Sequence, residues 1–186
     1  MKFIELITKR QSDRKYISDP IEKEKLDRCL EAARLAPSAS NSQPWTFVTV
    51  TNPELKEKVA LQTFSKLVPF NKFVVQAPVL IVMVLEKPKL VTRIGGAIKS
   101  MQYPMIDIGI AAEHFCLQAA EEGLGTCMLG WFNEKPIKEL LNIPKNKTIG
   151  LIITVGYTPK DYKLRTKIRK GFDEVVRYNS YENLKS

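Results

Sequence analysis

The sequence has few of the residues that build metal sites and catalytic triads. It contains one histidine, His114, and three cysteines, Cys29, Cys116 and Cys127. The cysteines are scattered among apolar neighbours and form no Cys-x-x-Cys pair, so we expect small buried hydrophobes rather than ligands or nucleophiles. His114 lies in a mostly apolar segment, which favours a core histidine. We therefore predict no metal site, and a Ser-His-Asp triad would depend on that one imidazole.

Long apolar runs and nucleotide-binding glycine motifs are also missing. The longest apolar run, Ala77 to Leu85, is far shorter than the roughly 20 residues of a membrane-spanning helix. The N-terminus is too charged for the apolar region of a signal peptide. No GxxxxGK[ST] occurs, and the glycines of 123–130 precede a predicted strand rather than follow one. We expect a cytoplasmic protein that does not bind a membrane and holds no nucleotide in the Rossmann manner.

The composition itself is that of a globular protein with a basic surface. The 186 residues include 29 Lys and Arg against 20 Asp and Glu, giving a net charge of +9, and 44% are hydrophobic. One domain over residues 1–186 is the default for this length. The positive charge predicts an anionic partner: nucleic acid, an anionic membrane or a phosphorylated ligand.

Hydrophobic periodicity predicts alternating helices and strands. We expect an α+β or three-layer α/β domain with a central mixed sheet, flanking helices and an extended C-terminal arm from about residue 160 to 186. No element is assigned to residues 87–103. The predicted helices are 2–9, a helix from Asp19-Pro20 to Pro37, one from Asn52-Pro53 to about Lys66, 104–122 and 135–141; the predicted strands are 45–51, 79–85, 126–131 and 148–157.

A first polar cluster follows the N-terminal helix. In an extended chain, Arg10, Ser12 and Arg14 point to the same side. Two guanidiniums and a hydroxyl match the oxygens of a phosphate. The alternative is a solvated charged turn.

A second cluster lies in the C-terminal tail. Cations at 163, 165, 167 and 169 repeat with the period of an extended chain. The alternative is a solvated tail or nonspecific polyanion binding, although Leu164 and Ile168 on the other side argue against a free basic tail.

A third cluster joins a helix to a strand. Residues 37–45 are rich in small polar side chains, lie between Pro37 and Pro44, and end at Trp45. Small residues allow a flat ligand to approach the backbone, and amides both donate and accept. The alternative is an ordinary loop of turn-forming residues.

Together these segments resemble the nitroreductase family of flavin enzymes. Residues 10–16 are similar to its R-x-S-x-[RK]-x-[FY] signature, and residues 36–45 resemble its A-P-S-x-x-N-x-Q-P-W segment. Residues 119–130 resemble A-x-x-x-G-L-G-T, and 167–174 resemble R-x-R-K-P-L-E-E, with Gly171 where proline is usual. The resemblance covers nearly the whole chain in order.

The resemblance implies an FMN-dependent, NAD(P)H-linked oxidoreductase that passes a hydride through flavin N5 to a nitroaromatic, quinone or similar acceptor in two half-reactions. It implies a homodimer with FMN at the subunit interface and the arm on the partner. The positions that match the family's FMN contacts are Arg10, Gln11, Ser12, Arg14, Lys167 and Arg169 at the phosphate and ribityl end, Pro37, Ser38, Ala39 and Asn41 from the other subunit, and Asn71, Leu129 and Gly130 near the ring.

Three other functions remain open at this stage. One is a specialised flavin enzyme of the same fold, such as a small-metabolite dehydrogenase or a dehalogenase. The others are a flavin carrier without turnover and a basic nucleic-acid-binding module. The last would need aromatic residues between its cations for base stacking, and residues 163–170 contain none, so we predict no nucleic-acid partner.

Overall fold

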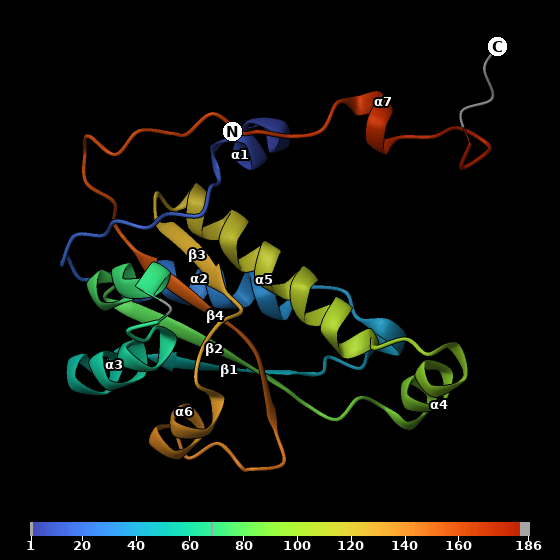
Figure 1. Ribbon diagram of the computed structural model, residues 1–186, viewed down its shortest axis with the longest axis horizontal. Helices are drawn as coiled ribbons and strands as arrows, with labels where there is room; N and C mark the ends of the chain where they lie inside the picture. The colour runs from blue at the N-terminus through green and yellow to red at the C-terminus, as the bar shows by residue number, and fades with distance from the viewer. Residues whose placement is uncertain (1, 68, 183–186) are drawn as a thin grey trace.

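The computed structural model, which describes residues 2–67 and 69–182, has a four-stranded sheet between two layers of helices (Figure 1). The strands are β1 (Trp45–Val50), β2 (Val79–Leu85), β3 (Gly125–Leu129) and β4 (Thr148–Gly156), in the order β1-β2-β4-β3. All neighbouring strands are antiparallel. We expected a mixed sheet. Among the described residues, the one parallel pairing is an isolated bridge between Ser12 and Thr126.

Two layers of helices cover the sheet, as expected. α2 and α5 pack on one face, where Ile81, Met83 and Phe115 are fully or almost fully buried. The 3₁₀ segment η3 packs with α3 and α6 on the other face, against Leu80 and Val82. The helical elements are α1 (Phe3–Lys9), α2 (Lys23–Arg34), η1 (Ala39–Asn41), α3 (Pro53–Ala60), η2 (Leu61–Thr63), η3 (Pro69–Gln76), α4 (Leu90–Lys99), α5 (Tyr103–Glu121), α6 (Glu134–Leu140) and α7 (Phe172–Val175).

Two predicted helix boundaries are wrong. The second helix begins after Glu22 rather than at Asp19-Pro20, because Glu22 and the residues before it remain extended. The third helix, capped by Asn52 as expected, ends at Ala60 instead of about Lys66. There Thr63 Oγ1 donates to the Ala60 carbonyl at 2.7 Å, which satisfies an acceptor that a longer helix would have used.

The sequence analysis also missed a helix. α4 lies within the unassigned residues 87–103. Its apolar residues Leu90, Val91, Ile94 and Ile98 have helical spacing, but Gly95-Gly96 lies among them, and glycine is a poor helix former.

The C-terminal segment beyond β4 is mostly extended, as predicted. Figure 1 shows it running past α1 and continuing to α7, away from the sheet. The last part of the predicted arm, residues 183–186, lies outside the described residues.

Membrane-spanning helices, clusters of potential metal ligands, the three cysteines and His114 can now be compared with the sequence expectations. No helix among residues 2–67 and 69–182 is long and apolar enough to span a bilayer. The same part of the chain has no cluster of potential metal ligands. The three cysteines are free and buried, as expected. His114 is half-buried, and its Nδ1 lies 3.3 Å from the carbonyl oxygen of Ala32.

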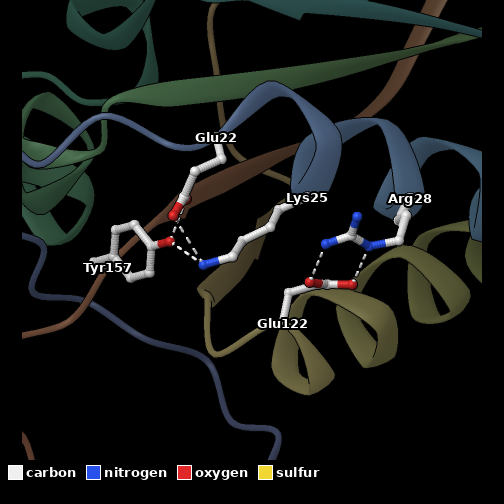
Figure 2. Close-up of polar contacts among 5 residues, drawn as sticks. All are labelled: Glu22, Lys25, Arg28, Glu122 and Tyr157. Atoms are coloured by element: carbon white, nitrogen blue, oxygen red, sulfur yellow. Dashed lines mark hydrogen bonds and ion pairs between the residues drawn. The ribbon is translucent and has the colours of Figure 1, made fainter.

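The N-terminal end of α2 is tied to the rest of the fold by two polar contacts (Figure 2). Tyr157, just after β4, donates to Glu22 and accepts a 2.6 Å hydrogen bond from Lys25. Arg28 makes a two-point ion pair with Glu122 at the end of α5, at 2.6 and 2.7 Å. The hydrogen bond from Tyr157 lowers the pKa of Glu22 to about 2. The hydrogen bonds from Arg28 lower the pKa of Glu122 to about 2 as well.

These pKa values predict a stability difference that depends on pH. Glu122→Gln should be less stable than the wild type at neutral pH, and the difference should disappear as the pH falls from about 4.5 to about 2. A lowered carboxyl pKa stabilises the fold only while the carboxyl is ionised. Urea unfolding across this range measures the difference, with Glu121→Gln as the control because Glu121 makes no ion pair with a described residue. A constant difference at every pH would contradict this account.

Candidate anion-binding site

The segment after α1 is fixed along the start of β3. Asp13 N donates to the Thr126 carbonyl at 2.7 Å, and Thr126 N donates to Asp13 Oδ2 at 3.2 Å. Burial raises the pKa of Asp13, and the hydrogen bond from Thr126 opposes the rise. Gly125 has no room for a side chain, since a Cβ there would lie 2.7 Å from Thr158 Cγ2 and 2.9 Å from Asp13 Oδ2. This close packing holds the segment on the sheet edge.

Ser12 and Arg14 both lie near the start of β3. Both act on the buried thiol of Cys127 on β3. Burial raises the pKa of Cys127, while the positive charge of Arg14 and a hydrogen bond with Ser12 oppose the rise. Asp13, between them, is buried in the other direction against Thr126.

The C-terminal segment lies antiparallel to the same residues; we call residues 162–167 the strap. Tyr162 Oη accepts from Arg14 N at 3.1 Å. Gln11 Oε1 accepts from the backbone N and the Nε of Arg165, at 3.0 and 3.4 Å. Arg165 also donates to the Ser12 carbonyl, and Lys167 donates to the Arg10 carbonyl. The two polar clusters therefore meet in one chain, although more than 150 residues separate Gln11 from Arg165 in sequence.

Each hydrogen bond described between the strap and residues 10–14 involves a side chain of one of the two segments. Gln11 provides the largest share, because its amide oxygen accepts from Arg165 and its amide nitrogen donates to the Lys163 carbonyl at 3.5 Å.

We therefore expect Gln11→Ala to loosen the strap. Trypsin should then cut the native protein faster after Lys163 and Arg165, because a cleavable bond must first leave the surface. Limited proteolysis followed by mass spectrometry measures the rate at each site. Gln102→Ala, at the N-cap of α5, is the control. Equal cleavage rates in the two variants would show that Gln11 does not hold the strap.

Cations from both ends of the chain converge on this strap, and we call Arg10, Arg165, Lys167 and Arg169 the cation cluster. Burial lowers the pKa of Lys167, and the charges of Arg10 and Arg169 lower it further. The negative charge of Glu113 on α5 opposes this lowering. Glu113 also accepts hydrogen bonds of 2.8 and 2.9 Å from Arg10 Nη2. Arg10 Nε is buried without a hydrogen-bond partner. The cluster therefore has the charge and the free donor to bind an anion.

Sequence reasoning did not include Arg165 or Glu113 among the site residues. Arg165 had a usable signal, because it belongs to the alternation of cations from 163 to 169. Glu113 had none, since only the packing of α1 against α5 brings it to Arg10.

Asn71 lies at the other end of β3. It is buried and donates from Nδ2 to the carbonyls of Thr63 and Trp131, at 3.0 and 3.3 Å. Leu129 is buried at the end of the strand, whereas Gly130 is exposed and has open space beside its Cα. With a rise of about 3.3 Å per residue, β3 separates Gly130 from the Ser12–Thr126 bridge by roughly 13 Å.

The loop at 37–43 has a defined conformation and lies apart from residues 10–14 and the strap. Ser40, Asn41 and Gln43 have φ of 51°, 50° and 47°. Gln43 N donates to Ser38 Oγ at 2.9 Å, and Ala39 N donates to Asp107 Oδ1 at 3.1 Å. The loop, which includes Pro37, thus sits by the first turns of α5, beside α4, while Arg10 of the cation cluster contacts α5 six residues farther along, at Glu113. One chain does not bring the two together.

The fold is that of a three-layer α+β protein, and a cluster of cations lies at the edge of its sheet. The chain belongs to the nitroreductase family, whose model matches residues 7–70 and 61–157.

Similar proteins carry related descriptions. The chain is 30% identical to a Clostridium difficile protein described as an FMN-dependent nitroreductase, with a TM-score of 0.78 and coverage of 96% of this chain and 100% of that one. It is 30% identical over 154 residues to the FMN reductase [NAD(P)H] of Bacillus subtilis, covering 76% of this chain and 60% of that protein. It is 26% identical over 197 residues to iodotyrosine deiodinase 1 of Sus scrofa, covering 94% and 68%.

Proposed function

We propose that this protein is an FMN-dependent oxidoreductase that uses NADH or NADPH to reduce a nitroaromatic, quinone or similar small acceptor. The convergence of Arg10, Arg165, Lys167 and Arg169 from the two ends of the chain carries the proposal. A phosphate would neutralise this cluster and accept from the unpartnered Nε of Arg10. The relatives described as FMN-dependent nitroreductase and FMN reductase support FMN as the phosphorylated ligand.

The residues present fit this group. Arg10, Lys167 and Arg169 would bind the phosphate, with Gln11, Ser12 and Arg14 beside it and toward the ribityl chain. Glu113 orients Arg10 through its two-point contact. Arg165 and Gln11 hold the strap so that Lys167 stays at the cluster. Charge and position are thus both supplied by the chain.

The ring would lie toward Asn71, Leu129 and Gly130. Gly130 is exposed and has open space beside its Cα, so a ring could approach its backbone closely. Asn71 fixes the chain there through the Trp131 carbonyl. Bound FMN would supply the redox chemistry, taking a hydride equivalent from NAD(P)H, which becomes NAD(P)+, and passing the electrons to the acceptor. A backbone donor beside the ring would stabilise the negative charge of the reduced state.

We also propose a homodimer with FMN at the subunit interface. Pro37, Ser38, Ala39 and Asn41 lie away from the cation cluster of their own chain, so a second subunit would have to supply them to the same flavin. The arm at about 160–186 carries exposed apolar side chains, among them Phe172 at 66% and Tyr178 at 76%, which suits an arm that packs on a partner. A dimer that keeps FMN on dilution is expected, and a monomer that keeps FMN would contradict the interface site.

Colour and bleaching test the function. The purified protein should be yellow, release FMN on denaturation and bleach anaerobically with NADH or NADPH. A flavin carrier would be yellow without bleaching. A nucleic-acid-binding module would be colourless and bind DNA with a steep salt dependence. A colourless protein that does not take up added FMN would contradict the proposal.

A dehalogenase of the same fold is the second candidate, because the chain resembles iodotyrosine deiodinase along 94% of its length. The reduced protein should therefore be mixed with nitrobenzoate, a benzoquinone and iodotyrosine separately. Iodide release as the fastest reaction would favour this second candidate.

A cytoplasmic location stays a prediction, consistent with three free cysteines.

A further inference from the structure

We propose that Asp107 on α5 and Thr92 on α4 are positioning residues for the flavin ring. Together they clamp Ala39 and so fix the shape that the loop at 37–43 presents to the ring. The inference rests on the proposed function, in which this loop contacts the ring. Three observations support it: the unpaired oxygen of Asp107, the two contacts of Ala39, and the left-handed backbone that follows Ala39.

Asp107 is a buried carboxyl group with one oxygen unpaired. It lies in the first turns of α5 and is only 3% exposed. Its Oδ1 accepts from Ala39 N at 3.1 Å. Its Oδ2 and Arg10 Nε are the two buried side-chain atoms without a hydrogen-bond partner among the described residues. Burying an unpaired polar oxygen costs free energy, so the fold gains little from this side chain beyond its hold on Ala39.

Ala39 is held from two sides. It begins the 3₁₀ turn η1, whose N-cap residue Ser38 makes no capping hydrogen bond. Ser38 Oγ accepts from Gln43 N instead. Asp107 therefore supplies the acceptor that the first N–H of the turn would otherwise lack. Thr92 Oγ1 donates to the Ala39 carbonyl at 3.3 Å. The N–H and the C=O of one residue thus bind side chains of two different helices.

The backbone after Ala39 has a conformation that costs free energy. Three residues with a Cβ have positive φ: Ser40, Asn41 and Gln43. Such conformations persist where the surroundings impose them, and they gather at ligand sites. Lys89 Nζ also reaches this loop, at the Ser40 carbonyl, but Lys89 is exposed, whereas Asp107 and Thr92 are 3% and 4% exposed. The two buried side chains are therefore the firm anchors of the loop.

Losing the clamp should affect the ring end of the flavin. A loop that samples several shapes binds more weakly, by the fraction of time that it spends in the competent one. The cation cluster reaches α5 at Glu113 rather than at this loop. FMN and riboflavin, which share the ring and differ in the phosphate, should therefore lose affinity by the same factor.

The test titrates the apoproteins of wild type, Asp107→Ala, Asp107→Asn and Thr92→Val with FMN and with riboflavin. Alanine removes the acceptor for Ala39 N, whereas asparagine keeps one. We expect Asp107→Ala to weaken the binding of both flavins by the same factor, roughly tenfold, and Thr92→Val to weaken both several-fold. Asp107→Asn should stay close to the wild type. Glu121→Ala, which removes an exposed carboxylate from the same helix, is the control.

The visible absorption band of bound FMN gives a second readout, at saturating FMN. Asp107→Ala and Thr92→Val should shift the band, because the surroundings of the ring change, and Asp107→Asn should restore it. Lys167→Ala provides the contrast, since it removes a cation at the phosphate end. It should weaken FMN binding, leave riboflavin binding unchanged and leave the band in place.

The outcomes separate this inference from the proposed function. A wild type that binds no FMN contradicts both. A wild type that binds FMN while Asp107→Ala and Thr92→Val bind both flavins normally contradicts the inference alone. So does a larger loss for FMN than for riboflavin, because Asp107 would then act on the phosphate end. Equal losses in Asp107→Asn and Asp107→Ala would show that the charge matters rather than the hydrogen bond. If Asp107→Ala does not fold, normal binding of both flavins by Thr92→Val overturns the clamp.

Discussion

Removing Arg10 should weaken FMN binding by tenfold to about a hundredfold. Arg10 is the member of the cation cluster with a buried donor that has no partner in the described structure. A charge-assisted hydrogen bond contributes about 1.5–3 kcal/mol, and each 1.4 kcal/mol is a factor of ten in affinity. The loss should appear as faster release of FMN, since most changes at a formed interface alter the dissociation rate.

The experiment requires care with Glu113, which Arg10 neutralises. Arg10→Ala alone would leave that carboxylate unpaired, so the comparison is Glu113→Gln against Arg10→Ala with Glu113→Gln. FMN fluorescence quenching on titration of the apoprotein gives the dissociation constants. Lys15→Ala controls for net charge, because Lys15 is exposed and has no ion pair in the described part of the chain. An unchanged dissociation constant in the double variant would show that Arg10 does not bind the phosphate.

Replacing Phe115 by alanine should destabilise the fold by about 3–5 kcal/mol, the usual cost of such a cavity. Phe115 is 1% exposed on α5, between α2 and the sheet. The melting temperature should fall by about 2–4 °C for each kcal/mol in a chain of this size. The same helix carries Glu113 and Asp107, which contact Arg10 and the loop at 37–43. Loosening α5 should therefore also weaken FMN binding.

Urea unfolding and calorimetry of FMN-saturated protein measure the loss, since bound ligand raises the apparent stability of both proteins. Leu61→Ala is the matched control: Leu61 is 48% exposed, so its truncation should change the free energy of unfolding by about 0.5 kcal/mol or less. Similar losses in the two variants would contradict the placement of Phe115 in the core.

Much of the fold was predictable because burial follows chain periodicity. The apolar run at 79–85 predicted a strand, and β2 is that strand, buried along almost its whole length. The helix predicted at 104–122 is α5, which lies between α2 and the sheet. α4 escaped detection because two glycines interrupt a pattern that is otherwise helical. The start of α2 was misplaced because Asp19-Pro20 resembles a helix cap, whereas the N-cap residue is Glu22 and the helix begins at Lys23.

The candidate site was predictable only in part, because residue spacing does not show which distant segments meet in the fold. Spacing alone showed that Arg10, Ser12 and Arg14 share a side and that the tail alternates cations. Their meeting depends on topology, because Gln11 and Arg165 are far apart in sequence. Glu113 had no sequence signal, since its role comes from its contact with Arg10, and Arg165 belongs to the alternating cations but its contacts with Gln11 appear only in the fold.

The central claim is that cations from both ends of the chain hold the phosphate of a flavin. Titrating the apoprotein with FMN and with riboflavin, which lacks the phosphate, tests it most directly. At least two charge-assisted contacts should be lost with riboflavin, so FMN should bind about a hundredfold more tightly or better, and added salt should narrow the gap. Equal affinity for the two flavins would contradict the account.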